Sequence, residues 1–209
     1  LAIAEHGLDI RNAFAAIYMP EAESKKRVSI PVETIRQIQH SCIEHDDDMR
    51  WLIALISDTG MRLAEAAGLH IDDIKLDEDI PYVDITPHPW RSLKTRGSQR
   101  QVPLVGASLW AAQRINANAS SYFAFPRYTD NTRCNANSAS NALNKWLHAN
   151  FRKEIIIHGA RHAMRDRLRA VSCPSEMIDQ IGGWSSGNVG DGYGEGFDLR
   201  SVVNCLEQI

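Results

Sequence analysis

The sequence lacks long hydrophobic runs, closely paired cysteines and any excess of positive charge, and each absence excludes a class of protein. No apolar stretch reaches the roughly 18 residues that a membrane-spanning helix needs, and no signal peptide opens the chain. Four cysteines are widely spaced and include no CxxC pair: Cys42, Cys134, Cys173 and Cys205. They form neither a disulfide framework nor a zinc motif, and they suit a reducing compartment. We therefore expect a cytoplasmic protein with no membrane segment.

The net charge of −3, with an isoelectric point near 6.3, argues against a strongly basic nucleic-acid-binding protein. The charges are unevenly spread, however, and binding needs only a local patch. Acids concentrate in residues 44–48 and 71–80. Bases concentrate in two other clusters: Arg91, Lys94, Arg96 and Arg100, and then Arg152, Lys153, Arg161, Arg165, Arg167 and Arg169. Either cluster alone is typical of a solvated surface, and only its coincidence with the motifs below favours a nucleic-acid-binding surface.

Apolar periodicity predicts a mainly helical chain with one small sheet. A helix is expected after Pro31, with a stripe of Ile35, Ile38 and Ile43. Further helices are expected at 49–58, from 59 or 61 to 69, and at 108–117, 138–148, 160–170 and 175–181. Residues 82–86 alternate as a strand, and 92–104 are expected to form a hairpin that turns at 97–98. The predicted fold class is α+β: mainly α with a small antiparallel β-sheet of about three strands.

Six polar residues spread over the chain form a set suited to phosphoryl transfer. They are Arg62 in TGMRLAEAAGL, Lys94 in SLKTRGSQRQVPL, His158 and Arg161 in HGARHAMRDRL, Trp184 in IGGWSS and Tyr193 in GYGEG. Arginine, lysine and histidine donors hold a phosphate and stabilise the extra negative charge that develops on it. A tyrosine among glycines adds an oxygen nucleophile on a flexible backbone. The set predicts phosphoryl transfer on a nucleic-acid backbone, with no metal and no cofactor.

The order Arg, Lys, His-x-x-Arg, His or Trp, and Tyr, with these flanking residues, resembles the tyrosine recombinase (lambda-type phage integrase) family. The resemblance covers roughly residues 24–197. It implies the family's catalytic-domain fold for residues 24–209. Residues 1–23 are then expected to be the remnant of an N-terminal core-binding domain and its linker, since the chain opens on Leu1 rather than methionine.

The resemblance also implies a role for each polar residue. Arg62 and Arg161 are expected to hold the scissile phosphate. Glu65 lies three residues after Arg62, a spacing that on its own indicates only an ordinary helical ion pair. In the family the matching acid helps to hold the arginine in place, so we assign Glu65 an orienting role. Lys94 is expected to protonate the departing 5′-oxygen from the first strand of the hairpin, with Arg96 as a rival.

Three further roles follow from the resemblance. His158 is expected to act as general base or as a phosphate donor, and Tyr193 as the nucleophile. Trp184 stands where many members carry a second histidine, and its indole can donate a hydrogen bond to phosphate or pack against neighbouring residues. We expect His162 to be a packed, hydrogen-bonded histidine. The spacing of His158 and His162 also suits a metal, but HGARH lacks the glutamate of HExxH, so no metal site is predicted.

The function predicted is site-specific DNA recombination through a covalent 3′-phosphotyrosine, in a bacterial prophage or genomic island. DNA contacts are expected from Arg91, Arg96, Arg100 and Arg165. The resemblance implies double-stranded DNA as partner, a homotetramer on DNA and a monomer without it. The apolar set of the tail at 201–209 is equally suited to docking on a neighbour and to packing at home. Two alternatives stay open: DNA relaxation as in type IB topoisomerases, and a DNA-binding regulator without catalysis.

Overall fold

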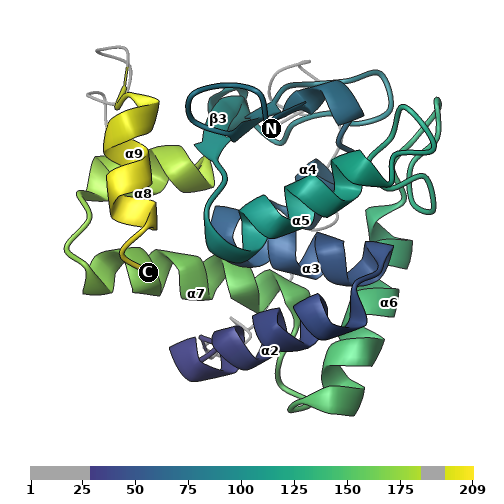
Figure 1. The fold of residues 1–209 in the computed structure, drawn as a ribbon, viewed down its shortest axis with the longest axis horizontal. Coiled ribbons are helices and arrows are strands. Elements are labelled where there is room, and N and C mark those ends of the chain that lie inside the picture. Colours follow the sequence, from purple (N-terminus) through teal and green to yellow (C-terminus); the bar gives the residue numbers. More distant parts are fainter. Residues whose placement is uncertain (1–28, 185–195) are drawn as a thin grey trace, which may run out of the picture.

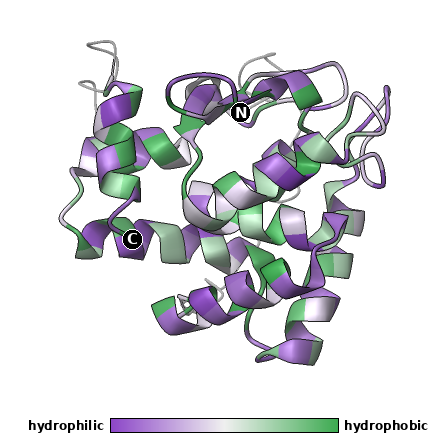
Figure 2. Cartoon of the chain, in the orientation of Figure 1, coloured by the Kyte–Doolittle hydropathy of each residue, from purple (hydrophilic) through white to green (hydrophobic). Residues whose placement is uncertain are grey.

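A nearly all-apolar helix, α3 (Asp48–Thr59), lies at the centre of the computed structural model, which describes residues 29–184 and 196–209 (Figure 1). Its residues from Leu52 through Thr59 are all buried. It packs against α2 (Val32–His45), α5 (Gly106–Ala117) and α7 (Ile157–Ala170). Helices α3 and α5 are among the less hydrophilic helices in Figure 2. A helix that is apolar on most sides is stable only when other elements cover it, and this explains the central position of α3.

Helix α2 forms where Pro31 predicts it, but one member of its buried stripe differs from the prediction. Ile35 and Ile38 are buried as expected, whereas the third buried residue is Cys42 and Ile43 is 45% exposed. A helix turns by about 100° per residue, so Cys42 falls between Ile35 and Ile38 while Ile43 lies roughly 80° away. Helical geometry therefore favours Cys42 at this position, although its neighbour Ile43 is more hydrophobic.

The small sheet has three antiparallel strands in the order β1-β2-β3, which confirms the predicted fold class. The strands are β1 (Ile74–Lys75), β2 (Tyr82–Ile85) and β3 (Arg100–Pro103). The predicted hairpin at 92–104 was wrong. Strand β3 pairs with β2, placing Val83 opposite Val102, while a 3₁₀ turn, η2 (Arg96–Ser98), precedes β3. This pairing buries two valines together, and residues 92–95 offer only Leu93 as an apolar partner.

The remaining helices surround this centre. Helix α4 (Leu63–Ala67) follows α3, and a short 3₁₀ turn, η1 (Ile71–Asp73), precedes β1. Helix α6 (Ala136–Asn150) packs on α4 and α7, and it buries Ala139, Leu143 and Leu147. Ala142 and Trp146 are half-buried.

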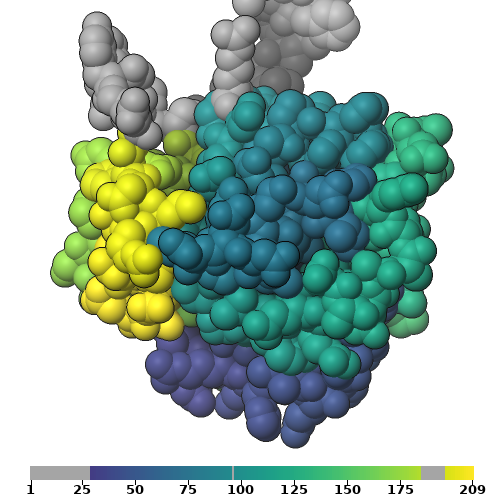
Figure 3. Space-filling view, turned by 45° about the horizontal axis from the view of Figure 1, so that its top comes forward, coloured from purple at the N-terminus to yellow at the C-terminus, as the bar shows by residue number. Residues whose placement is uncertain are grey.

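Helices α8 (Ser175–Gly182) and α9 (Leu199–Leu206) lie together at one end of the molecule (Figure 1). Helix α9 packs against β3 and buries Val202 and Leu206, so the tail packs on its own chain in this structure. Figure 3 shows its yellow surface in contact with the neighbouring teal surface. Among the described residues, no helix is long and apolar enough to span a membrane.

A buried carboxylate, Asp58, joins four helices near the centre. Its Oδ1 accepts hydrogen bonds from Gln39 Nε2 (2.7 Å) on α2 and from Arg167 Nη2 (2.9 Å) on α7. Its Oδ2 accepts from the main-chain N–H of Ala107 (2.9 Å), in the first turn of α5. Arg167 is also buried and donates to the carbonyl of Ser57. Each charge therefore has several partners, as a buried ion pair requires.

Replacing Asp58 with alanine should destabilise the chain by about 3–5 kcal/mol, because it leaves the buried Arg167 without a counter-charge. The measurement is the free energy of unfolding in urea. The matched control is Asp166→Ala, which removes the exposed partner of Arg169 at 3.9 Å and should change stability by less than about 1 kcal/mol. Equal effects of the two substitutions would contradict the role assigned to Asp58.

Candidate active site

The segment between α3 and α4 turns so that Arg62 and Glu65 face each other. Gly60 ends α3 in the left-handed conformation, with φ of 61°, and Arg62 then caps α4 in an extended conformation. Glu65 Oε2 accepts the main-chain N–H of Arg62 (2.9 Å), and Oε1 accepts from its Nη1 (2.6 Å). Glu65 thus holds both the backbone and the guanidinium of Arg62. Helix α4 begins at Leu63, slightly later than the sequence predicted.

Three arginines from different elements meet at the C-terminal end of α8. Arg100 Nε on β3 donates to the carbonyl of Ile181 (2.7 Å). Arg161 Nη2 on α7 donates to the carbonyl of Gly182, and Arg62 Nη2 donates to that of Gly183 (3.0 Å). The last carbonyls of a helix have no partner within it and carry partial negative charge. Successive carbonyls of one helix end therefore gather guanidinium groups that lie 38 to 99 residues apart in sequence.

The two glycines before Trp184 make this arrangement possible. Gly183 ends α8 with φ of 59°, and a Cβ there would lie 2.7 Å from Arg100 Nη1. A Cβ on Gly182 would lie 2.0 Å from the ring of Trp184. A side chain at either position would displace an arginine or the indole. The GGW sequence is thus explained by close packing at the helix end.

Glu65 lies between two of the arginines and carries the negative charge that holds them. It is 3% exposed, and Arg100 Nη2 donates to its Oε2 at 3.0 Å. Burial alone raises the pKa of a carboxyl group, but the charges and hydrogen bonds of Arg100 and Arg62 outweigh it and hold the pKa of Glu65 below its ordinary value. Glu65 therefore stays ionised in the folded chain.

Within the part of the chain that the structure describes, one carboxylate faces the three cations at this helix end and does not neutralise them. Burial, together with the positive charges of Arg62 and Arg100, lowers the pKa of Arg161 to about 9. Arg161 also donates to the carbonyl of Gly60. Burial and neighbouring cations disfavour the charged form of Arg161, and a nearby anion would stabilise that form. The site is therefore electrostatically suited to bind an anion.

Trp184 stacks on two arginines of α7. The guanidinium carbon of Arg161 lies 4.4 Å from the centre of the indole ring, and that of Arg165 lies 4.9 Å from it. Arg165 also pairs with Asp179 of α8 at 2.9 Å. Trp184 thus packs against neighbouring residues, which is one of the two roles that the sequence suggested. Its indole holds α7 and α8 together through cation–π contacts.

His158 lies one turn before Arg161 on α7 and is exposed. His162 packs edge-on against it, with ring centres 4.9 Å apart. The expected hydrogen bond of His162 is not found at Nε2, which is buried without a partner in the part of the chain that the structure describes. Because α7 places residues three apart on one side, His158 and Arg161 share a helix face, as the spacing predicted.

Lys94 is exposed in the loop that precedes η2. This loop is tied to the arginines four residues later, because Ser98 Oγ accepts from Arg62 Nη1 (3.0 Å) and the Ser98 carbonyl accepts from Arg100 Nη1 (2.7 Å). The sequence predicted that Lys94 lies on a strand, but the structure places it on a loop. Tyr193 and the side chain of Arg96 lie outside the described residues.

Two of the predicted DNA contacts need correction. Arg91 is 3% exposed and donates to the carbonyls of Glu65 and Thr86, and Arg100 is 8% exposed behind Glu65. Each also lies beside a buried carboxylate, Arg100 at 3.0 Å from Glu65 and Arg91 at 3.8 Å from Asp73, so both arginines stabilise the site from within. Arg100 and the buried Val102 are two residues apart on β3 and therefore share one face of the strand, which was the sequence signal that could have revealed this.

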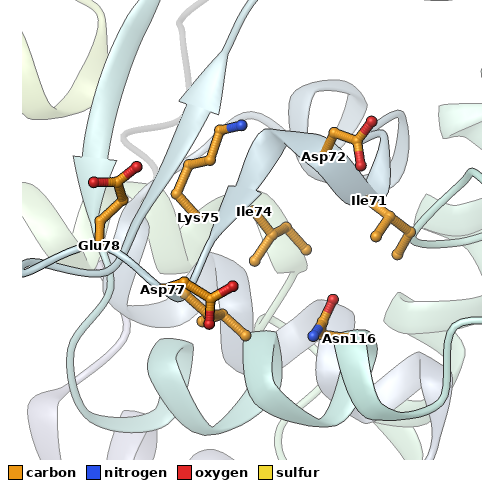
Figure 4. A pocket seen from close by; sticks show the side chains of 8 residues that line it. Ile71, Asp72, Ile74, Lys75, Asp77, Glu78 and Asn116 are labelled. Carbon is orange, nitrogen blue, oxygen red and sulfur yellow. The ribbon is translucent and has the colours of Figure 1, made fainter.

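A separate hollow of about 300 Å³ lies between β1 and the last turn of α5 (Figure 4). It is lined by Ile71, Asp72, Ile74, Lys75, Leu76, Asp77, Glu78 and Asn116. Its three carboxylates outnumber its one lysine, so this hollow repels a phosphate. The arginine cluster, and not this hollow, is the candidate site.

Replacing Glu65 with glutamine should destabilise the chain by about 3 kcal/mol at pH 7, because the buried Arg100 and the half-buried Arg62 lose their counter-charge. The folded-state pKa of Glu65 is below its unfolded value of 4.5, so its contribution is complete above pH 4.5 and is lost as pH falls through the folded pKa. Urea unfolding of both chains between pH 3 and 7 should therefore show the stability gap closing at low pH.

The matched control is Glu44→Gln, which removes an exposed carboxylate 3.4 Å from His40. It should leave both the stability and its pH profile close to those of the unaltered chain. A gap for Glu65→Gln that stays constant down to pH 3 would show that the charge of Glu65 is not what stabilises the site.

Solved structures of recombinases share this fold. The integrase of transposon Tn1549, in complex with a circular intermediate DNA, superposes with a TM-score of 0.64 at 15% identity, covering 98% of this chain and 70% of that one. XerA recombinase gives a TM-score of 0.59 at 18% identity, covering 81% of this chain and 58% of that one. The fold is therefore that of tyrosine recombinase catalytic domains.

Sequence comparison identifies the family. Tyrosine recombinase XerC of Neisseria meningitidis serogroup C is 25% identical over 193 residues, covering 88% of this chain and 60% of XerC. XerC of serogroup B is also 25% identical, with 88% and 61% covered. The chain thus spans about 60% of the length of these curated relatives. The sequence model of the phage integrase family matches residues 29–195, most of the chain, and the chain therefore belongs to the phage integrase family.

Proposed function

We propose that the chain is a site-specific DNA recombinase that cleaves and rejoins strands through a covalent 3′-phosphotyrosine. The observation that carries the proposal is the meeting of Arg62, Arg100 and Arg161 at one helix end, where Glu65 is the one carboxylate among the described residues that pairs with them. Arg62 and Arg161 are the two of these arginines assigned to phosphate, while Arg100 holds Glu65. Positive charge fixed in place before the substrate arrives is what stabilises a phosphoryl-transfer transition state.

In the proposed reaction the oxygen of Tyr193 attacks the scissile phosphorus in line, and the bond to the 5′-oxygen breaks. His158 accepts the tyrosine proton or donates to a phosphate oxygen, and Lys94 donates a proton to the departing 5′-oxygen. Arg62 and Arg161 neutralise the charge that builds up on the phosphoryl oxygens, while Trp184 keeps Arg161 stacked in place. The 5′-hydroxyl of a partner strand then attacks the phosphotyrosine and releases Tyr193.

This reaction consumes no ATP, because the phosphotyrosine retains the energy of the phosphodiester that was broken. The substrate proposed is double-stranded DNA carrying a recombination site, bound by a homotetramer that assembles on DNA from monomers. Residues 1–23 are proposed to be the remnant of a core-binding domain and linker, and 24–209 the catalytic domain. Likeness to the Tn1549 transposon integrase supports a mobile element such as a prophage or genomic island, acting in a bacterial cytoplasm.

The covalent intermediate is directly testable. The 209-residue chain should form an SDS-stable adduct with end-labelled, nicked duplexes of randomised sequence, because the fragment beyond the nick diffuses away and cannot religate. Tyr193→Phe should abolish the adduct, since phenylalanine has no nucleophilic oxygen. The readout is the shifted, labelled protein band, and sequencing the captured duplexes yields a defined substrate.

The matched control is Tyr122→Phe, which removes the hydroxyl of a tyrosine that is 77% exposed and should form adduct at the unaltered rate. DNA that is bound but never attached would indicate a regulator without catalysis. Adduct formation with relaxation of supercoiled DNA, but no exchange between duplexes, would indicate a topoisomerase.

The role of Lys94 is tested by changing the leaving group. Lys94→Ala should slow adduct formation by about 10²- to 10⁴-fold, the usual contribution of a general acid. A captured duplex in which sulfur replaces the bridging 5′-oxygen should restore the rate, because a thiolate leaves without a proton. Single-turnover rates on the two duplexes supply the comparison.

Arg96→Ala is the informative control, since Arg96 is the rival for this role. If Arg96 only contacts DNA, its replacement should slow adduct formation to the same extent on both duplexes. Sulfur rescue of Arg96→Ala, with none for Lys94→Ala, would transfer the general-acid role to Arg96.

A further inference from the structure

Gln180, in the last turn of α8, holds the chain at Phe197 with both ends of its amide. Its Nε2 donates to the Phe197 carbonyl (2.8 Å), and its Oε1 accepts the Phe197 N–H (2.8 Å). Such a two-point contact fixes both the position and the direction of the backbone at this residue, which a single hydrogen bond does not. Phe197 precedes Asp198, the residue that caps α9.

Gly196 is shaped to allow this contact. Its φ is 76°, a conformation that favours glycine, and a Cβ there would lie 2.7 Å from Gln180 Oε1. The side chain of Gln180 and the absence of a side chain at Gly196 are therefore complementary. Both are needed for the backbone at Phe197 to lie against α8.

The same helix also holds the chain on the other side of residues 185–195. The main-chain N–H of Trp184 donates to the carbonyl of Asp179 (2.9 Å), the residue next to Gln180. The following carbonyls, from Ile181 through Gly183, accept the three arginines. The chain thus leaves and rejoins the described fold at neighbouring residues of α8, beside the arginine cluster.

The covalent chain links this contact to the nucleophile. Tyr193 is four residues before Phe197, and four residues span at most about 14 Å when fully extended. A Phe197 fixed on α8 therefore sets an upper limit on the distance between Tyr193 and α8. If Phe197 were released, the tether would start at Asp198, the cap of α9, and that limit would increase.

We propose that Gln180 is a positioning residue, which holds Phe197 on α8 and so keeps Tyr193 within reach of a phosphate bound by Arg62 and Arg161. The proposal rests on the proposed function of Tyr193. It concerns the rate of the chemical step and not DNA affinity, because Gln180 bonds to the protein backbone. Stability should change little, since water replaces exposed hydrogen bonds at small net cost.

Two substitutions break the contact from opposite sides. Gln180→Ala removes the amide, and Gly196→Ala places a Cβ against its oxygen. Each should lower the single-turnover rate of adduct formation about 10- to 100-fold, the order of loss expected when a reacting group is displaced by about 1 Å. Gln180→Glu keeps the acceptor and loses the donor, so its rate should lie between those of Gln180→Ala and the unaltered chain. DNA affinity, measured in a Tyr193→Phe background, should stay within about twofold.

The matched control is Gln208→Ala, which also removes an amide that donates to a main-chain carbonyl, that of Asn204 at 2.6 Å. It should leave the adduct rate unchanged. Amide hydrogen exchange without DNA supplies an independent readout. Exchange at Phe197 should be faster in Gln180→Ala and Gly196→Ala, and unchanged in Gln208→Ala.

The two readouts separate the ways in which the proposal can fail. Unchanged exchange at Phe197 in Gln180→Ala would show that the contact does not hold the chain. Faster exchange with an unaltered adduct rate would show that the contact does not position Tyr193. A rate that falls in step with thermal stability or DNA affinity would make Gln180 merely structural. If the unaltered chain forms no adduct, the proposed function fails and the positioning role with it, while exchange still reports whether the contact exists.

Discussion

The candidate site depends on one interaction, the binding of arginine side chains by the carbonyls at the end of α8. Any helix leaves its last carbonyls unpaired, and their partial negative charge attracts cations. Here Arg62, Arg100 and Arg161 supply them from α4, β3 and α7. A guanidinium has five N–H donors in a fixed plane, so it can bind a carbonyl and still present donors to a phosphate. A lysine in the same place would have no such geometry.

Glu65 converts this collection of cations into a stable site without neutralising it. Its two oxygens hold Arg62 and Arg100, and its lowered pKa keeps it ionised. Arg161 has no such carboxylate partner among residues 29–184 and 196–209, and burial beside other cations lowers its pKa to about 9. The fold therefore keeps uncompensated positive charge where the proposed reaction develops negative charge. This is electrostatic preorganisation, obtained through burial and hydrogen bonding before substrate binds.

Helix α8 also connects this site with the segment that carries the proposed nucleophile. Its carbonyls hold the arginines, Asp179 holds Arg165, and Gln180 holds Phe197. The indole of Trp184 stacks on Arg161 and Arg165 just beyond the helix. A short helix of eight residues is thus held mainly by polar contacts at its end and by apolar contacts along Met177, Ile178 and Ile181. Any displacement of α8 would move the phosphate-binding groups and the tether of Tyr193 together.

The sequence by itself determined the fold class, most helices and the identity of the polar set, because helical periodicity and residue spacing are local properties. It placed Glu65 beside Arg62, because the residue that caps a helix and the third residue of its first turn lie close together wherever the helix lies. Only the tertiary structure decided that Arg91 and Arg100 are internal and that β3 pairs with β2. Strand pairing and burial depend on which distant surfaces meet, and no local pattern in the sequence between Arg62 and Arg100, which are 38 positions apart, predicts that meeting.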